Sequence, residues 1–128
     1  MIYVDTSVVL ARLFAEDRRP RETLWDDDLV SSRLLAYEIF NRLNARGAGV
    51  EALAAARALV GRIRLAAMSE AMLSDAMGPL PLAPRTLDAL HLATMTALRR
   101  AGLALRFATF DDRFAAAAKA LGFEDEAI

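Results

Sequence analysis

Short apolar, β-branched runs alternate with longer segments of helical periodicity along most of this chain. Residues 2–4, Ile-Tyr-Val, favour an extended strand, and with so little chain before them they are most readily buried as a central one. The pattern then changes abruptly, because polar residues from Asp5 to Ser7 precede an apolar segment at 8–15 that is dense enough for a helix. The sequence therefore predicts a strand that ends in an acid and turns directly into a helix.

Further strands and helices are expected to alternate over the rest of the chain. The expected strands are residues 29–31, 63–68 and 103–110, the expected helices are 33–46, 50–60, 70–77, 85–100 and 114–121, and residues 123–128 add an edge strand or fray. Proline at 79, 81 and 84 makes the connection before residue 85 rigid. The alternation predicts a single α/β domain over residues 1–128, with three α/β/α layers and a central parallel sheet of four to five strands.

Acidic residues recur where the expected strands end. Asp5 follows the first strand, Asp111 and Asp112 follow the fourth, and Glu38 lies within two turns of the start of the helix after the second strand. Asp88 lies in the first turn of an apolar helix, where it stabilises the helix dipole by about 0.3 to 1 kcal/mol, or is half-buried and needs a partner. Because the carboxyl ends of parallel strands share one edge of the sheet, where open α/β folds bind ligands, we expect these acids to converge.

The composition narrows the chemistry available at that edge. The chain has no cysteine and one histidine, His91, which excludes disulfides, thiolate nucleophiles, cysteine zinc sites and a two-histidine zinc motif. Its 17 acidic and 16 basic residues give a formal net charge of -1, so contact with nucleic acid requires a local basic surface. No apolar run approaches the roughly 18 residues of a membrane span, and no basic leader precedes the first strand, so we expect a cytoplasmic protein with no membrane partner.

Carboxylates gathered at one edge of a sheet need a counter-charge, because like charges raise one another's pKa or attract a cation. Arg113 is the only arginine beside Asp5 or Asp111 in the sequence, which makes a hard divalent ion the simpler solution. Oxygen ligands that retain some water suit Mg²⁺ or Mn²⁺. Such ions activate water and stabilise a leaving oxygen, so phosphodiester hydrolysis would need no histidine base.

Four segments of the chain together resemble the PIN-domain nucleases, and most closely the VapC-type ribonuclease toxins of prokaryotic toxin-antitoxin pairs. They are Val-Asp-Thr-Ser at 4–7, Leu-Ala-Tyr-Glu-Ile at 35–39, Arg-Thr-Leu-Asp-Ala-Leu-His-Leu-Ala at 85–93 and Ala-Thr-Phe-Asp-Asp-Arg-Phe at 108–114. Each motif alone is weakly specific, whereas four in register over the whole chain are strongly so. No acid of the family's metal-site set is missing.

The resemblance implies an endoribonuclease that hydrolyses RNA phosphodiester bonds with Mg²⁺ or Mn²⁺ and acts as a toxin. It implies a homodimer, silenced by a cognate antitoxin protein whose tail lies in the active-site groove. The implied catalytic and metal-binding residues are Asp5, Glu38, Asp88 and Asp111, with Asp112 as either a further ligand or only a cap for the next helix, and with hydroxyl support from Thr6 or Ser7 and from Thr109.

Three alternative functions fit less well. A phosphoacceptor receiver domain requires a lysine at the end of a late strand, whereas Lys119 falls inside the last expected helix. A phosphatase with a strand-end aspartate requires a second acid two residues later, where Ser7 stands. A PIN fold kept only as a binding module has no need of intact acids.

The single histidine has two possible roles. His91, three residues after Asp88, either reaches that acid or the substrate, or is a packed, hydrogen-bonded residue of its helix, which is the commoner case.

Overall fold

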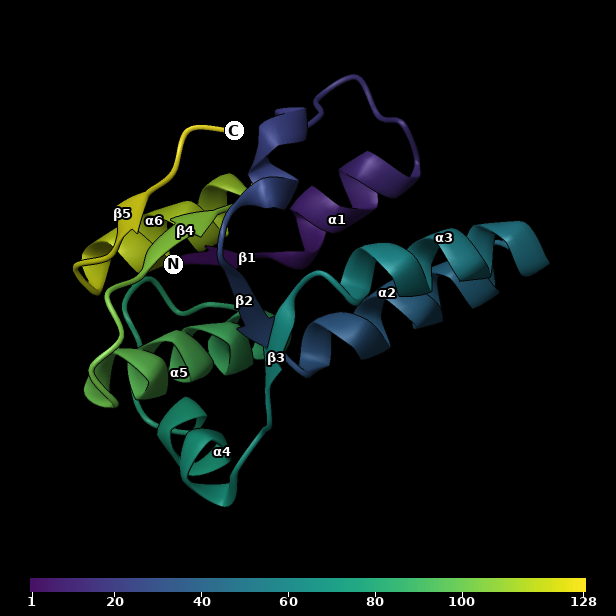
Figure 1. The fold of residues 1–128 in the computed structure, drawn as a ribbon. Helices are drawn as coiled ribbons and strands as arrows, with labels where there is room; N and C mark the ends of the chain where they lie inside the picture. Colours follow the sequence, from purple (N-terminus) through teal and green to yellow (C-terminus); the bar gives the residue numbers. More distant parts are fainter.

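A five-stranded parallel sheet with β1 at its centre organises the computed structural model, which describes residues 1–128 (Figure 1). The strands lie in the order β3-β2-β1-β4-β5, and every neighbouring pair is parallel. Their bounds are β1 Ile2–Val4, β2 Leu29–Ser32, β3 Arg64–Ala66, β4 Arg106–Ala108 and β5 Glu124–Asp125. The predicted α/β fold with a parallel sheet of four to five strands is confirmed, and the expected edge strand after residue 122 forms as β5.

Strand β4 is much shorter than the predicted 103–110, because its partner β1 offers only three residues for pairing. The register joins Ile2 to Arg106, Tyr3 to Phe107 and Val4 to Ala108, and the ladder ends there. Strand β3 is likewise confined to the three positions that pair with β2.

Six α-helices and one 3-10 helix connect the strands. They are α1 Thr6–Leu13, η1 Glu22–Asp26, α2 Leu34–Ala45, α3 Val50–Val60, α4 Glu70–Ala76, α5 Thr86–Arg100 and α6 Asp112–Ala120. Helices α1 and α6 begin earlier than the predicted residues 8 and 114, because the side chains of Asp5 and Asp111 cap them and accept hydrogen bonds from backbone N–H groups of the first turn. None of these helices has the length and apolar character needed to cross a bilayer.

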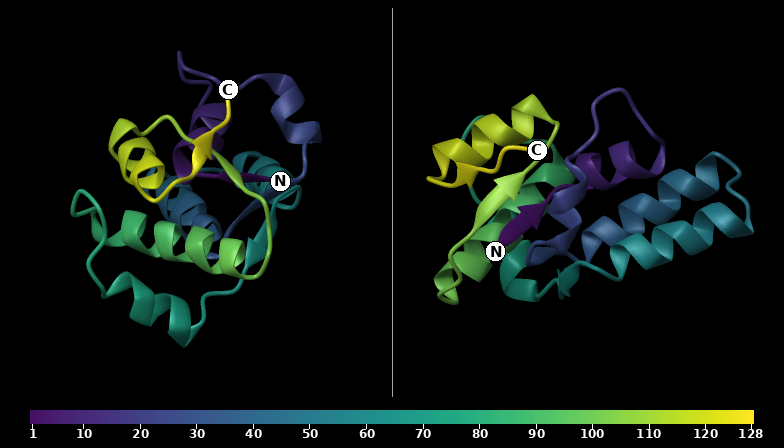
Figure 2. Two further views of the ribbon diagram at one scale, coloured as in Figure 1. Left: turned by 90° about the vertical axis from the view of Figure 1, so that its left-hand side faces the viewer. Right: turned by 45° about the horizontal axis from the view of Figure 1, so that its top comes forward.

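The alternation of side chains along β1 divides the core between the two faces of the sheet. Ile2 and Val4 join the cluster built with α1, α2 and α3, whereas Tyr3 joins the cluster built with α5 and α6. Figure 2 shows α2 and α3 extending together away from the sheet, while α4 lies against α5. Helix α4 contributes no buried residue. The sheet is therefore covered on both faces, as predicted for three layers.

The chain reverses its direction of travel across the sheet at β1. Strands β2 and β3 lie on one side of β1, and β4 and β5 lie on the other. At the carboxyl end of β1 the backbone N–H of Asp5 donates to the carbonyl of Ala108, 3.0 Å away, which ties the two strand ends together. A switch point of this kind is where open α/β sheets bind their ligands.

Candidate active site

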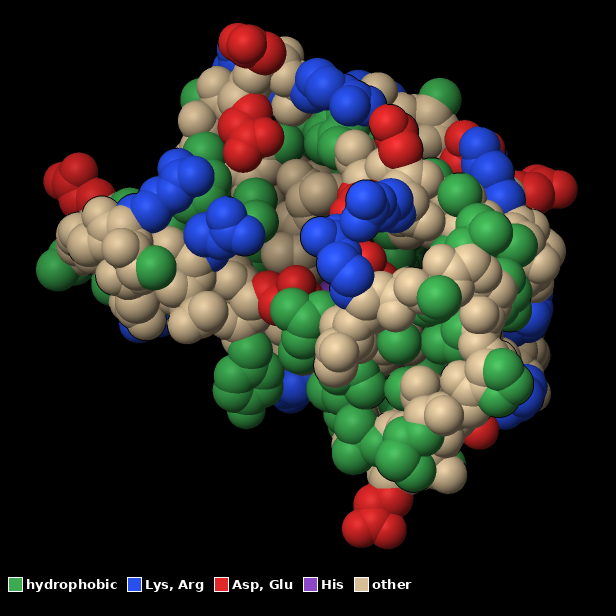
Figure 3. Space-filling model, turned by 180° about the vertical axis from the view of Figure 1, so that it is seen from behind, with side chains coloured by type: hydrophobic (Ala, Val, Ile, Leu, Met, Phe, Trp, Pro, Cys, Tyr) green, Lys and Arg blue, Asp and Glu red, His purple; other side chains and the backbone are tan.

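Acidic side chains from four separate segments line one pocket at this switch point. The cavity has a volume of about 540 Å³, and its walls include Asp5, Glu38, Asp88 and Asp111. The structure thus brings together the four acids that the sequence singled out. Asp112 does not line this pocket and lies in a neighbouring hollow. Seen from behind, acidic and basic side chains surround a central hollow of the surface (Figure 3).

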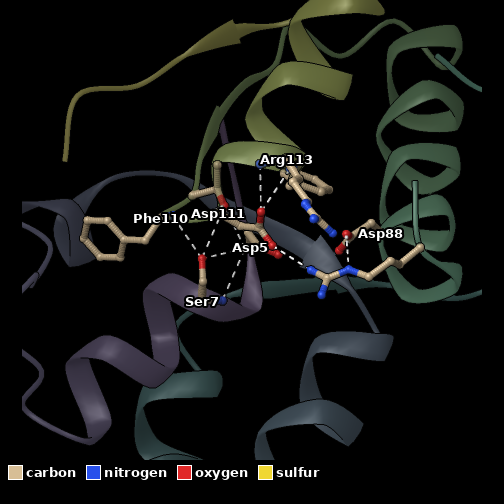
Figure 4. Close-up of polar contacts among 9 residues, drawn as sticks. Asp5, Ser7, Asp88, Phe110, Asp111 and Arg113 are labelled. Atoms are coloured by element: carbon tan, nitrogen blue, oxygen red, sulfur yellow. Dashed lines mark hydrogen bonds and ion pairs between the residues drawn. The ribbon is translucent and has the colours of Figure 1, made fainter. Parts of the chain in front are cut away.

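Asp5 is fixed by hydroxyl groups through one of its two carboxylate oxygens. Its Oδ2 accepts hydrogen bonds from Ser7 Oγ at 2.6 Å and from Thr109 Oγ1 at 2.8 Å, and a longer one from Ser7 N–H at 3.3 Å. Oδ1 accepts no hydrogen bond. The side chain is buried, and the result is an oriented carboxylate with one oxygen available to a ligand. Figure 4 shows Asp5, Ser7, Asp88 and Asp111 facing one another, with the Phe110 ring turned away.

Glu38, in the second turn of α2, is held by a chain of buried hydrogen bonds. Ser32 N–H donates to the Tyr3 hydroxyl at 3.1 Å, and that hydroxyl lies 2.6 Å from His91 Nδ1. Because the Glu38 carboxylate can only accept, we assign the ring proton to Nε2, which donates to Glu38 Oε1 at 2.6 Å, and Nδ1 then accepts from the Tyr3 hydroxyl. Thr6 Oγ1 donates to the same oxygen at 3.0 Å. Burial raises the pKa of Tyr3, which keeps its phenol protonated as this chain requires.

His91 is thus a packed, hydrogen-bonded residue of its helix, the second of the two possibilities drawn from the sequence. Its side chain is 1% exposed and its ring nitrogens are taken up by Tyr3 and Glu38, so it does not bond to Asp88.

Arg85 links the two remaining acids across the pocket. Asp111 uses Oδ1 to accept from the N–H groups of Arg113 and Phe114 at 2.9 and 3.2 Å, which caps α6. Its Oδ2 accepts from Arg85 Nη2 at 3.0 Å, and Arg85 Nε lies 3.5 Å from Asp88 Oδ2. This contact was not predicted, because Arg85 is adjacent in the sequence to neither Asp5 nor Asp111. The spacing of three residues between Arg85 and Asp88 at a helix start was the available signal.

Burial and the charges of neighbouring acids together shift the pKa of Asp88. Burial raises the pKa of this carboxyl, the negative charges of Asp111 and Asp5 raise it further, and Arg85 opposes them. The N-termini of α1, α5 and α6 all face the pocket, because Asp5 and Asp111 are caps and Asp88 lies in a first turn. Each helix end stabilises a nearby carboxylate by about 0.3 to 1 kcal/mol. These helix ends and Arg85 together allow the acids to share one pocket.

The carboxylate oxygens of the pocket are the type of ligand that a hard divalent ion prefers, although the four side chains are not spaced so as to surround one. No three acidic or histidine side chains are arranged so that they could hold a metal ion as they stand. The pocket nevertheless presents four carboxylates and no sulfur or free imidazole ligand, which is the chemistry that Mg²⁺ and Mn²⁺ prefer. The pKa of Asp88 is raised first by burial and then by the negative charges of Asp111 and Asp5, and a cation would relieve the second of these effects. These side chains would have to move to complete a site.

Comparison with known proteins gives two matches. The sequence model of the PIN domain family matches residues 2–120 of this chain. Ribonuclease VapC46 of Mycobacterium tuberculosis (strain ATCC 25618 / H37Rv) is 35% identical over 133 aligned positions, which cover 94% of this chain and 92% of that protein. No solved structure matches the chain.

Proposed function

Because the chain belongs to the PIN domain family, we propose that it is a Mg²⁺- or Mn²⁺-dependent endoribonuclease, the toxin of a VapBC-type toxin-antitoxin pair. The observation that carries this proposal is the meeting of Asp5, Glu38, Asp88 and Asp111 in one pocket at the switch point of the sheet. The similarity to Ribonuclease VapC46 over nearly the whole of both chains supports the same reaction class.

These four acids would hold the metal, which supplies an activated water and stabilises the charge on the leaving oxygen. The chain's own groups orient the acids for that task. Ser7 and Thr109 fix one oxygen of Asp5, and His91 and Thr6 fix one oxygen of Glu38. These hydrogen bonds fix the orientation of both carboxylates and leave the second oxygen of each one free for a ligand in the pocket. Pre-arranged ligands of this kind reduce the reorganisation needed when the site forms.

Asp112 serves the start of α6 in this proposal and is not a ligand. It is the first residue of that helix, where its charge favours the helix dipole, and it lies outside the acid pocket.

RNA requires positive charge beside the acids, since the chain as a whole carries a net charge of -1. Arg42 and Arg85 line the pocket with the acids, and Arg18 lies 5.0 Å from the centroid of the Phe110 ring in the adjoining hollow. Guanidinium groups suit the bidentate recognition of phosphate. They provide the local basic surface that a chain with a net charge of -1 needs in order to bind RNA.

The proposal includes a cognate antitoxin protein, a homodimer and a cytoplasmic location, where cellular RNA is the substrate. A protein partner would bind most readily where large apolar side chains are exposed, and one region of this molecule has several of them. Met77 is 84% exposed and Leu82 is 69% exposed, and Leu73 and Leu87 are also exposed along the same stretch of α4, the connection after it and the start of α5.

Substitution of the acids tests the proposal. Asp5→Asn and Asp111→Asn should abolish cleavage of a single-stranded RNA in Mg²⁺ or Mn²⁺ while far-UV circular dichroism stays unchanged. Asp75→Asn is the matched control, because this aspartate lies on α4 and contacts only Arg100. Cleavage at the wild-type rate by the purified Asp5→Asn protein would refute the catalytic assignment. Binding of RNA by the wild-type protein without cleavage in either metal would instead indicate a binding module.

Metal dependence is tested separately by thermal unfolding. A divalent ion that binds only the assembled acids stabilises the folded state, so millimolar Mn²⁺ or Mg²⁺ should raise the melting temperature of the wild-type protein. The Asp5→Asn variant should show a smaller rise. An unchanged melting temperature of the wild-type protein in both metals would count against the metal site.

A further inference from the structure

The four acids of the pocket do not offer their oxygens equally. Asp5 and Glu38 each commit one oxygen to hydrogen bonds within the protein and leave the other free, and Asp88 has only its Oδ2 near a cation. Asp111 differs, because Oδ1 caps α6 and Oδ2 accepts from Arg85. Neither oxygen of Asp111 is therefore free of a hydrogen bond while Arg85 stays in place, and a metal ion at Oδ2 would lie directly beside the guanidinium.

The contact made by Arg85 is one that can be broken without disturbing the fold. Its side chain is 65% exposed, and the only groups that it bonds are the carboxylates of Asp88 and Asp111. The residue lies just before the first residue of α5, so its removal from the pocket costs neither a helix hydrogen bond nor a buried contact. Exposed ion pairs of this kind contribute little to stability, because solvent screens them. The guanidinium is thus held in the pocket mainly by the charge of the acids.

We propose that Arg85 is a resident counter-ion of the acid pocket, which a divalent ion displaces and which then binds the phosphate of the RNA beside the metal. This inference rests on the proposed function. A guanidinium and a divalent ion repel each other and require the same oxygen of Asp111, so they do not share the pocket in the arrangement seen here. Once displaced, Arg85 remains tethered at the rim, where its planar fork matches a phosphate group. The exchange would couple metal loading to substrate binding.

The competing explanation is purely structural, since Arg85 also joins the N-terminus of α5 to that of α6. A structural link predicts that removal of the arginine lowers stability and leaves metal affinity unchanged or weaker. Displacement predicts the opposite sign for metal, because the variant no longer has to release a competing cation. The sign of the change in Mn²⁺ affinity therefore separates the two.

Calorimetric titration with Mn²⁺ alone, without RNA, is the decisive measurement. Arg85→Ala should bind Mn²⁺ about three- to tenfold more tightly than the wild-type protein, from the loss of two weak ion pairs. Arg42→Ala is the matched control: it removes the same charge from the same pocket, but Arg42 bonds to none of the acids, so its effect should be smaller. Unchanged or weaker Mn²⁺ binding by Arg85→Ala would overturn the displacement proposal.

Cleavage kinetics test the second half of the proposal. Arg85→Ala should raise KM for RNA severalfold more than it lowers kcat. Arg85→Lys should keep a Mn²⁺ affinity close to that of the wild-type protein, because the charge remains, yet still show a raised KM, because the fork is lost. An unchanged KM in both variants would overturn the phosphate contact.

The two proposals fail in distinguishable ways. Tighter Mn²⁺ binding by Arg85→Ala in a protein that cleaves no RNA would refute the nuclease assignment and the phosphate contact, and would leave the counter-ion role standing. Normal cleavage by the wild-type protein, with no gain in Mn²⁺ affinity in Arg85→Ala, would refute the counter-ion role and leave the nuclease assignment standing. A wild-type protein that binds neither Mn²⁺ nor Mg²⁺ would overturn both.

Discussion

Removal of the Tyr3 hydroxyl tests the buried hydrogen-bond chain that holds Glu38. Tyr3 is fully buried, and its hydroxyl lies between Ser32 N–H and His91 Nδ1. Tyr3→Phe keeps the ring packing and leaves these two polar groups without a partner. It also leaves the imidazole free to adopt the other tautomer, in which Nε2 no longer donates to Glu38.

The cost follows from the two groups that lose their partner. Each buried donor or acceptor left unsatisfied costs about 1 to 3 kcal/mol, partly offset because the buried hydroxyl itself is gone. We therefore expect Tyr3→Phe to lower the free energy of unfolding by about 2 to 4 kcal/mol. With a urea dependence of about 1 to 3 kcal/mol per molar for a small domain, the midpoint should fall by roughly 0.7 to 4 M.

Urea unfolding followed by the fluorescence of Trp25, the only tryptophan and a buried one, provides the assay. Tyr37→Phe is the matched control, because Tyr37 is 70% exposed and its hydroxyl makes no hydrogen bond, so its effect should stay within about 0.5 kcal/mol. If the two variants have the same midpoint, the hydrogen-bond chain does not stabilise the fold and our account of how Glu38 is held is wrong.

Two further predictions concern acids of the pocket. Because the pKa of Asp88 is raised, its ionised form opposes folding at pH values above that pKa; Asp88→Asn should therefore unfold at a higher urea concentration than the wild-type protein at pH 7 without metal, while losing cleavage. The gain should shrink as the pH falls through the raised pKa, and urea titrations that show a lower midpoint at pH 7 would contradict this. Asp111→Ala should cost about 1 kcal/mol by removing the cap of α6, whereas Asp111→Asn keeps most of it. Equal midpoints for the two Asp111 variants would argue against the cap.

Local pattern predicted most of the fold, since each element carries its own signal. Helix α3 has the predicted bounds, and the strand at residues 2–4 was recognised from its β-branched and aromatic residues. The errors lie at element ends. Helices α1 and α6 begin two residues earlier than predicted, because Asp5 and Asp111 cap them. The three-residue length of β1 limits β4, which residues 103–110 by themselves could not reveal.

The site was predictable as far as it depends on topology. Parallel strands bring their carboxyl ends to one edge, so acids that follow strands meet there. The contacts that tune them were not predictable, because they join residues far apart in the chain: Tyr3 and His91 are separated by 88 positions, and Arg85 and Asp111 by 26. Which rotamer brings such groups together is decided by packing in three dimensions.

The pairing of β1 with β4 has a consequence for the timing of biosynthesis. Asp5 is synthesised well before the hydroxyl of Thr109 that orients it, which lies 104 positions later, and before the neighbouring strand, which ends at Ala108. A nascent chain can pair β1 with β2 early, but it lacks β4, the second partner of β1, until nearly all of the domain has emerged. The pocket is therefore completed only after residues 106–111 have been synthesised and have folded, and a polypeptide that stops before them does not assemble the four acids.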